Sequence, residues 1–306
     1  MLSGCARLGW HFSMTRPVAS FSYSEAFSRN LGWLTRDEQE KLRQTKVAIA
    51  GLGGVGGIHL ITLARLGVGR FSLADFDVFD VPNFNRQAGA MVSTIGEAKM
   101  EVMARTARDI NPEATIEAFP HGVSESNVAA FLADVDIYID GLDYFAFSAR
   151  QMLYKELAER RIPAVIAAPL GMGVALVNFL PGGMQFEEFF RVSGCSEEEQ
   201  ALRFLVGLSP AMLQRTYLVD RSFVDFRNRK GPSTVMACQL CAGFAATEAL
   251  KIVLKRGKVL GAPWGLHFDP YRYKFKRTWR PWGNRNPIQK LALALARRQI
   301  ASTASA

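Results

Sequence analysis

A glycine-rich turn between two apolar segments is the feature that most constrains the fold. Residues 47–57 read VAIAGLGGVGG, and IHLITLARLGVG follows directly. The run VAIA is apolar throughout, as in a strand buried on both faces, whereas Leu60, Leu63 and Ala64 recur at the spacing of a helix that packs on a sheet. The glycines therefore lie at a strand-to-helix turn, where a helix N-terminus favours anions. We interpret it as a phosphate-binding turn, although glycine clusters also occur in turns that bind nothing.

The glycines have different expected uses. Gly51 permits the tight bend, and Gly56 allows the helix to pack closely on the sheet. Gly53 and Gly54 let the backbone approach a phosphate. Such a turn also needs an acid at the end of the second strand to hold ribose hydroxyls. Asp75 lies 24 residues after Gly51, at this place. A capping acid is the simpler alternative.

Signals for strands and helices alternate from residue 46 to about 180. This pattern predicts a Rossmann-like α/β fold, with a mostly parallel sheet and helices on both faces. We expect strands at 46–51, 69–76, 114–119, 135–140 and 163–167. We expect helices at 55–67, 97–110, 124–133 and 145–161, followed by an extended stretch at 171–180.

The rest of the chain is less regular. Residues 184–232 have poor periodicity, which indicates either a functional crossover loop or a missed element. A strongly apolar helix is expected at 234–255, and one or two C-terminal strands at 264–279. One domain would cover 21–282, with a disordered extension at 1–20 that starts at Met1 or Met14. Residues 283–306 would form a short basic helix and a disordered tail.

Composition is that of an ordinary globular protein, with 49% hydrophobic and 21% charged residues. We expect no apolar stretch long enough to span a membrane. The four cysteines are too few for a disulfide framework, which indicates a reducing, cytoplasmic compartment.

The positive charge is concentrated near the C-terminus. The net charge is +9, and residues 268–298 hold nine Lys or Arg against one acid, Asp269. The rest of the chain is therefore nearly neutral, and a nucleic-acid partner is not expected. Aromatic residues interleave with these cations and could stack on bases or bind an acidic protein; they are Tyr271, Tyr273, Phe275, Trp279 and Trp282. A strand with one apolar and one solvated basic face is the simpler explanation.

Two cations and an acid indicate whether the turn binds a dinucleotide or ATP. Arg86 in DVFDVPNFNRQ and Lys99 in IGEAK exceed what the pyrophosphate of a dinucleotide needs, but they suit a triphosphate. In DIYIDGLDYF, Asp143 lies just past the strand that ends at Asp140, where open α/β sheets bind ligands. Such an acid can hold the magnesium ion that accompanies ATP.

These segments carry a resemblance. In order and spacing, GLGGVG, LADFDVFDVPNFNRQ, IGEAK, INP and DGLDYF resemble the adenylyltransferase family that includes ThiF, MoeB and the activating enzymes for ubiquitin and ubiquitin-like proteins. The helix TVMACQLCAGFAATEALKIV extends the similarity to about residue 270. Members of this family use magnesium ATP to adenylate the C-terminal carboxylate of a small protein, or another carbonyl substrate.

The resemblance implies ATP and Mg²⁺ as cofactors and a small carrier protein or peptide as partner. It also implies a homodimer that does not associate with a membrane. It assigns catalysis or phosphate binding to Arg86, Lys99 and the magnesium-associated Asp143. It assigns nucleotide binding to Gly51, Gly53, Gly54, Gly56 and Asp75, with Asp77 beside them. Arg29 in FSRNLGW would reach a phosphate across the dimer interface, although a surface arginine would look the same.

The chain also departs from the family. Bacterial members place two CxxC pairs around zinc, whereas the single pair here, Cys238 and Cys241, falls inside the apolar helix. We therefore expect core thiols and no structural zinc. Cys195 lies where relatives that form a thioester place their nucleophile, but acidic residues 197–199 oppose a lowered thiol pKa.

Substrate range stays open as well. Family members often have small or polar residues at the positions of Gly141, Leu142 and Tyr144. Two other functions fit the same turn: an NAD- or FAD-dependent oxidoreductase, and a non-catalytic member that binds nucleotide and a partner.

Overall fold

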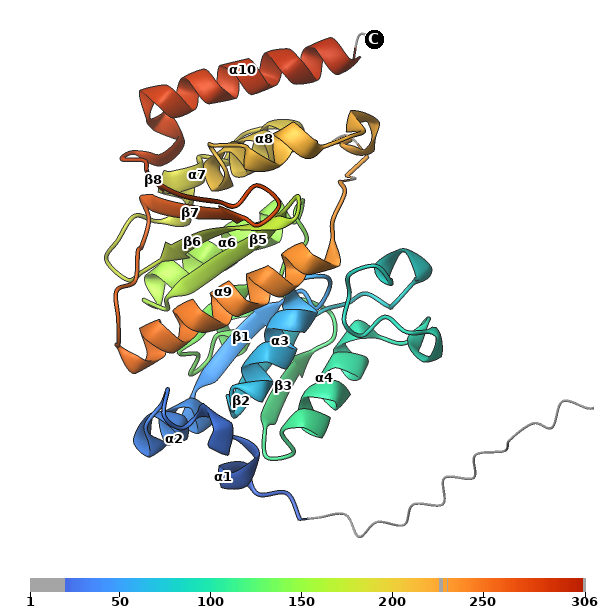
Figure 1. The fold of residues 1–306 in the computed structure, drawn as a ribbon, viewed down its shortest axis with the longest axis vertical. Helices are drawn as coiled ribbons and strands as arrows, with labels where there is room; N and C mark the ends of the chain where they lie inside the picture. Colours follow the sequence, from blue (N-terminus) through green and yellow to red (C-terminus); the bar gives the residue numbers. More distant parts are fainter. Residues whose placement is uncertain (1–19, 226–227, 230, 305–306) are drawn as a thin grey trace, which may run out of the picture.

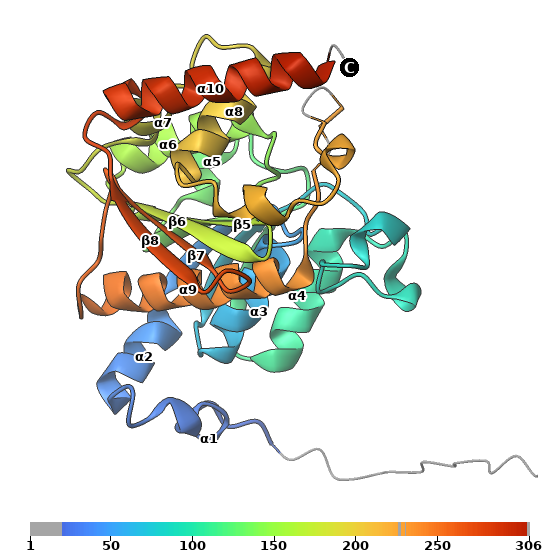
Figure 2. The same cartoon turned by 45° about the horizontal axis from the view of Figure 1, so that its top comes forward.

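An eight-stranded sheet lies between two layers of helices (Figures 1 and 2). This computed structural model describes residues 20–225, 228–229 and 231–304, so the expected disordered extension falls almost entirely outside the described residues. The strand order is β3-β2-β1-β4-β5-β6-β7-β8. The strands are β1 Lys46–Ala50, β2 Arg70–Ala74, β3 Thr115–Phe119, β4 Ile137–Asp140, β5 Ala164–Leu170, β6 Gly173–Phe179, β7 Trp264–Asp269 and β8 Lys274–Trp279.

Strands β1 to β5 pair in parallel and β6 to β8 add an antiparallel extension. The predicted Rossmann-like sheet is therefore confirmed, and the C-terminal alternation forms two strands. Because parallel strands end at one edge, Ala50, Ala74 and Asp140 lead into loops at the same edge of the sheet. We call it the carboxyl edge.

The helices cover both faces. In the N-terminal half they are α1 Tyr23–Ala26, η1 Ser28–Asn30, α2 Arg36–Gln44, α3 Gly56–Arg65, η2 Val81–Asn83, η3 Val92–Thr94, α4 Lys99–Ile110, α5 Val128–Phe131 and α6 Phe147–Glu159. In the C-terminal half they are α7 Phe186–Phe190, α8 Glu197–Leu208, η4 Leu213–Tyr217, η5 Arg221–Phe223, α9 Val235–Leu254, η6 Gly283–Arg285 and α10 Pro287–Ala304.

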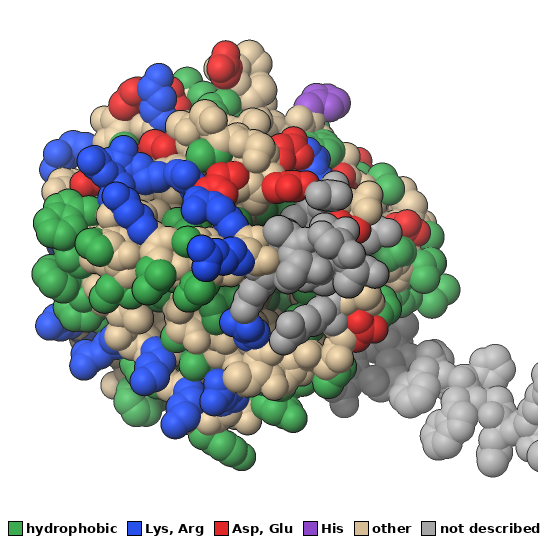
Figure 3. All heavy atoms as spheres, turned by 90° about the horizontal axis from the view of Figure 1, so that it is seen from above, with side chains coloured by type: hydrophobic (Ala, Val, Ile, Leu, Met, Phe, Trp, Pro, Cys, Tyr) green, Lys and Arg blue, Asp and Glu red, His purple; other side chains and the backbone are tan. Residues whose placement is uncertain are grey.

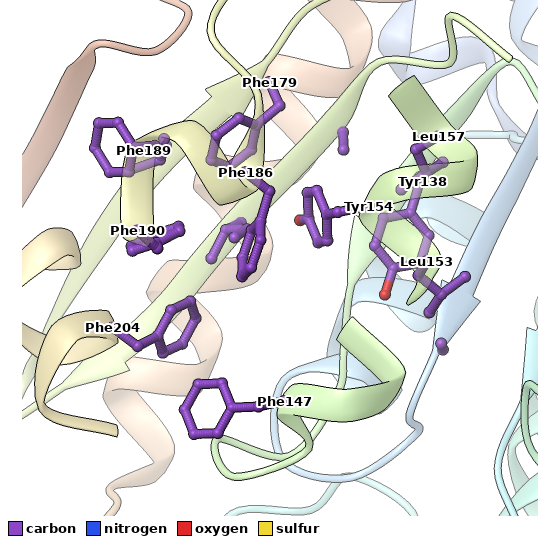
Figure 4. Packing of buried hydrophobic residues seen from close by; sticks show 14 of the residues in the cluster. Tyr138, Phe147, Leu153, Tyr154, Leu157, Phe179, Phe186, Phe189, Phe190 and Phe204 are labelled. Atoms are coloured by element: carbon purple, nitrogen blue, oxygen red, sulfur yellow. The ribbon is translucent and has the colours of Figure 1, made fainter. Parts of the chain in front are cut away.

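Alternate residues of each central strand pack into two hydrophobic cores, one on each face of the sheet. Val47 and Ile49 pack in the core beneath α3, α4 and α9, whereas Ala48 and Ala50 face the core beneath α5 to α8. The second core is rich in aromatic rings (Figure 4). In it, Tyr154 stacks on Phe186 with ring centroids 4.5 Å apart. Burial of such rings is a large favourable term in folding.

The segment 184–232 is more regular than its sequence pattern. It contains α7 and α8, so the alternative of a missed element is correct for its first half. Ser196 caps α8 by accepting a hydrogen bond from the Glu199 amide at 3.4 Å. Phe204 of α8 packs against Phe190 of α7, with centroids 4.8 Å apart. The irregular part is thereby shortened to the residues after Leu208.

Helix α9 agrees with the sequence prediction, but it corrects the expectation about membrane spans. Its 20 residues include a window with hydropathy 1.4, so α9 is long and apolar enough by length and composition alone. The helix packs against α3, β5 and β6, and Cys241, Ala245 and Ala249 lie in the core. Its apolar composition therefore has a structural explanation as a core helix.

The C-terminal helix is longer than expected. Helix α10 extends to Ala304, and only residues 305–306 of the expected disordered tail lie outside the described residues. Leu293 of α10 is buried against Leu202 and Val206 of α8. Packing on α8 therefore stabilises a helix whose sequence alone indicates only a short amphipathic segment.

Candidate active site

The glycine turn joins β1 to α3 at the carboxyl edge. The Gly51 amide donates to the Ala74 carbonyl at 2.7 Å, and its φ of +85° suits glycine. A Cβ at Gly51 would collide with the Gly141 carbonyl oxygen, and one at Gly56 would collide with the Gly51 carbonyl oxygen. These two glycines are therefore needed for the chain to pack on itself.

Gly53 is different, because the chain leaves room beside it, whereas Gly54 is packed closely by side chains. A Cβ at Gly53 would come no closer than 3.7 Å to the Gln87 side chain, and one at Gly54 would lie 3.3 Å from Cys238 Sγ. Internal packing does not exclude a side chain at Gly53. This open backbone suits close approach by a ligand.

Asp75 holds the glycine turn in place. Its Oδ2 accepts a hydrogen bond from the Leu52 amide at 2.5 Å, and its Oδ1 accepts one from the Asp77 amide at 2.8 Å. Burial raises the pKa of Asp75, while these two amides act to lower it. Asp75 therefore does cap the turn, and each oxygen keeps acceptor capacity that a ribose hydroxyl could use.

Lys99 and Asp77 form a pair beside the turn. Lys99 begins α4 and is buried, yet its Nζ lies 3.1 Å from the Oδ2 of the exposed Asp77. The Lys99 amide also donates to the Asp77 carbonyl at 2.9 Å. The structure therefore holds a lysine charge at a helix N-terminus near the carboxyl edge, paired with one solvent-facing acid.

Arg86 lies over Gly54 without a carboxylate partner among the described residues. Its Nη1 donates to the Pro82 carbonyl at 3.1 Å and to Asn85 Oδ1 at 2.8 Å. Asn85 in turn donates to the Ser233 carbonyl at 2.9 Å, which ties this segment to the start of α9. The Cγ and Cδ atoms of Arg86 pack on Gly54, and no described carboxylate neutralises its guanidinium.

The two aspartates after β4 have separate positions. Asp140 is buried, and its Oδ2 lies 2.9 Å from Arg150 Nε. Asp143 is exposed, and its Oδ1 accepts the Phe145 amide at 3.0 Å. Arg150 Nη2 also donates to the Leu142 and Asp143 carbonyls, at 3.1 and 3.0 Å. Arg150 therefore fixes the loop that presents Asp143.

The sequence reasoning missed Arg150. Its signal is an arginine on the buried face of a predicted helix, at helical spacing from Phe147, Leu153 and Tyr154. A cation at such a position needs a buried acid, and Asp140 lies ten residues before it.

Cys195 and Arg29 lie apart from this cluster. Cys195 is half-buried before α8, and its Sγ contacts the Arg191 carbonyl at 3.7 Å; in the described chain it has no hydrogen bond to the glycine turn. Arg29 is exposed on η1, where Asn30 bonds the Leu66 carbonyl at 3.1 Å, beside the start of β2. That end of the sheet is opposite the carboxyl edge (Figure 1). One protomer does not bring Arg29 to the site.

The cysteine pair lies on the buried face of α9. Cys238 and Cys241 are buried, and burial raises the pKa of both thiols. Within the described ranges, no group of three or more His, Cys, Asp or Glu side chains converges as a metal site would.

A family model of the ThiF family matches residues 27–287. The chain belongs to the ThiF family. The resemblance of the chain to this family is thus confirmed.

Individual relatives match in part. The chain is 37% identical over 140 residues to tRNA threonylcarbamoyladenosine dehydratase of Bacillus subtilis, covering 45% of this chain and 54% of that protein. It is 33% identical over 270 residues to the probable adenylyltransferase/sulfurtransferase MoeZ of Mycobacterium tuberculosis, covering 74% of this chain and 66% of MoeZ. The chain thus spans about half the length of the first of these relatives.

A solved structure supports the same fold. The crystal structure of Escherichia coli MccB with ATP aligns with a TM-score of 0.61 at 20% identity, covering 83% of this chain and 70% of MccB. At this identity the likeness concerns the fold.

Proposed function

We propose that this protein is an ATP-dependent adenylyltransferase that activates a carboxylate. The observation that carries the proposal is the open backbone at Gly53, with Arg86 beside Gly54 and without a carboxylate partner among the described residues. Lys99 supplies a second charge nearby. Two cations beside a glycine-rich turn suit a triphosphate whose charge must be neutralised during reaction. Family membership and the solved structure of MccB with ATP support the same nucleotide.

In the proposed reaction, a substrate carboxylate oxygen attacks the α-phosphorus of ATP. The bond to the bridging oxygen breaks, pyrophosphate leaves, and an acyl-adenylate remains. Lys99 and Arg86 would stabilise the negative charge on the phosphates, and Asp75 would orient the ribose. Positioning and charge neutralisation therefore account for the catalysis we assign to the chain.

Asp143 fits a magnesium ion. Its side chain is exposed at the carboxyl edge, and the Phe145 amide occupies one carboxylate oxygen only. Magnesium is commonly held by one or two carboxylates together with substrate phosphates. When bound, the ion would supply Lewis-acid neutralisation of phosphate charge. The Asp140–Arg150 pair would keep Asp143 in place.

For the substrate, we propose the C-terminal carboxylate of a small carrier protein or peptide. MoeZ is named an adenylyltransferase, and MccB has also been crystallised with MccA, which supports a protein or peptide partner. The name of the Bacillus relative instead refers to a tRNA. A reducing, cytoplasmic location is part of the proposal, because Cys195, Cys238 and Cys241 are free thiols.

We also propose a homodimer. The segment from Phe76 to Ile95 exposes several large apolar side chains; they are Phe76, Val78, Val81, Phe84, Met91, Val92 and Ile95. Exposed apolar patches of this kind mark interaction sites. A two-fold partner covering this segment would also be the source of an Arg29 side chain for the site, since Arg29 of the same protomer lies at the other end of the sheet.

Pyrophosphate exchange tests the function. The protein is incubated with ATP, labelled pyrophosphate and a panel of carboxylates, beginning with small proteins encoded beside it. We expect exchange with one of them and none without it. Absence of exchange with every class, together with tight NAD binding, would favour the oxidoreductase alternative.

A further inference from the structure

Gln87 has a buried side-chain amide that the chain leaves without a hydrogen bond. The residue is 8% exposed, and its Oε1 is shielded from solvent and has no partner. Its amide forms no hydrogen bond with any described residue. An unpaired buried polar group is unfavourable for folding, and most buried amides in proteins are paired. The packing of the chain therefore does not explain a glutamine at this position.

The Gln87 amide faces the glycine turn. The three atoms nearest to a Cβ placed on Gly53 are Nε2, Cδ and Oε1 of Gln87, at 3.7, 3.8 and 4.0 Å. The backbone of Gln87 is held in place, because its amide donates to the Asn83 carbonyl at 2.9 Å and its carbonyl accepts from the Ala90 amide at 3.1 Å. The unpaired side chain thus lies beside Gly53, where the turn leaves room.

Other buried amides in the described chain differ from Gln87. Asn111 and Asn178 also have an unpaired Oδ1. However, Asn111 Nδ2 donates to the Val68 carbonyl at 3.3 Å, and Asn178 Nδ2 donates to Glu248 Oε2 at 2.8 Å. Each of them therefore has a structural role through its nitrogen. Gln87 has no such bond at either end of its amide.

The ribose of a bound nucleotide supplies the donors that such an acceptor needs. Phosphate oxygens only accept hydrogen bonds, and the two cations of the site already suit them. The 2′ and 3′ hydroxyls of ribose can donate, and they lie on adjacent carbons. Asp75 is one acceptor for them, and its Oδ2 is held by the Leu52 amide at 2.5 Å. Gln87 places a second acceptor beside Gly53, the next residue in the turn.

We propose that Gln87 accepts a hydrogen bond from the ribose hydroxyl of ATP that Asp75 leaves free. The inference rests on the proposed function, since ATP is the nucleotide. No hydrogen bond to the chain fixes which end of the Gln87 amide faces the turn, so Oε1 can rotate toward the ligand. The contact would make the site select ribonucleotides over a deoxynucleotide.

Calorimetric titration of the full chain with ATP, 2′-deoxy-ATP and 3′-deoxy-ATP tests the contact. Gln87→Met keeps the length of the side chain and removes the amide. We expect it to weaken ATP binding about three- to tenfold, the range for one neutral hydrogen bond. With one of the two deoxynucleotides, the variant and the wild type should bind alike, because the hydroxyl that Gln87 contacts is already absent.

Thermal unfolding separates this role from a structural one. The midpoint of Gln87→Met should stay the same or rise, because an unpaired buried amide is removed. The matched control is Gln289→Met. Gln289 is 2% exposed, and its Nε2 donates to the Val206 carbonyl at 3.2 Å and to Asn284 Oδ1 at 3.3 Å. This control should lower the midpoint and leave ATP affinity unchanged.

Basic side chains elsewhere are a possible source of weak nucleotide binding. Figure 3 shows Lys and Arg side chains on the α10 side of the molecule, where they could attract phosphates. The titrations are therefore made at about 0.15 M salt, which screens exposed charges. Such binding is also the same for the three nucleotides, so it cancels when they are compared.

Two results would overturn the inference. One is equal ATP affinity in Gln87→Met and the wild type. The other is an equal loss of affinity for all three nucleotides, which would indicate a contact with phosphate or adenine, or an effect of packing. If the wild type binds ATP in either case, the adenylation proposal stands. Failure of the wild type to bind ATP would overturn both proposals.

Discussion

Arg150 Nε lies 2.9 Å from Asp140 Oδ2, with both side chains only 2–3% exposed. The same guanidinium donates to the Leu142 and Asp143 carbonyls. A buried ion pair therefore connects the end of β4, the loop that presents Asp143, and helix α6. The pair belongs to the support of the site, since Arg150 acts on Asp143 through the backbone.

We predict that Arg150→Met destabilises the fold by about 3–5 kcal/mol, because Asp140 would stay buried without its partner. Urea unfolding measures this change. The control is Arg160→Met, whose ion pair with Glu156 is partly exposed and should contribute less than about 1 kcal/mol. Equal losses in the two variants would mean that the Asp140–Arg150 pair has no special role.

Two glycines of the turn should separate folding from binding. Gly56→Ala places a methyl group against the Gly51 carbonyl oxygen and should lower stability by a few kcal/mol, about the range of core overpacking. Gly53→Ala has room and should keep stability within about 1 kcal/mol. We expect Gly53→Ala to lose ATP affinity nonetheless. Thermal unfolding and nucleotide titration check both variants, and unchanged ATP affinity in Gly53→Ala would argue against phosphate contact there.

Acid should destabilise the protein through a buried histidine. Burial lowers the pKa of His59 from 6.5 to about 3. The unfolded chain therefore takes up this proton first as the pH falls, so the contribution is fully present above about pH 6.5 and is lost toward pH 3. Through this group, lowering the pH from 7 to 5 should reduce the free energy of unfolding by about 2 kcal/mol.

His267 should act in the same direction, since burial lowers its pKa to about 4. Urea unfolding at pH 7 and pH 5 is compared for the wild type and His59→Leu. The substitution should remove about 2 kcal/mol of the pH dependence, whatever its effect on absolute stability. An unchanged pH dependence would show that His59 is not the responsible group.

The sequence was most informative where local pattern and tertiary packing agree. The glycine turn, β1 to β5 and α9 follow from apolar periodicity and turn chemistry. The sequence analysis did not predict helix α8. Its first turn consists of Glu197, Glu198 and Glu199, which are typical of a solvated acidic segment. In the fold, Glu197 pairs with Arg229 and Glu199 with Arg297, both at 2.6 Å. These partners lie 32 and 98 residues away, whereas the Glu199–Arg203 pair, four residues apart at 2.6 Å, is one that a local pattern can indicate.

The same limit applies to the site. Asp75, Lys99 and Arg86 come together because the parallel strands end at one edge, which the sequence predicts. Asp75 holds the glycine turn by accepting a hydrogen bond from the Leu52 amide. No spacing rule in the sequence identifies this contact. Arg29 does not reach the site within one protomer, because η1 lies at the opposite end of the sheet.

Subunit mixing tests the proposed dimer. Asp143→Ala should abolish adenylate formation but retain much ATP binding, because the glycine turn and Asp75 remain. Arg29→Ala should also be inactive. In a mixed C2 dimer one site would keep both residues, so pyrophosphate release should partly recover once subunit exchange is verified. No recovery in verified heterodimers would refute the trans role of Arg29.

Calorimetric titration with magnesium ATP and with NAD distinguishes an adenylyltransferase from an NAD-dependent oxidoreductase. We expect saturable binding of magnesium ATP, weaker binding of NAD, and loss of ATP affinity in Arg86→Ala and Lys99→Ala. An intact thermal unfolding transition in each variant serves as the control for folding. Tight NAD binding with no heat from magnesium ATP would contradict the adenylyltransferase assignment.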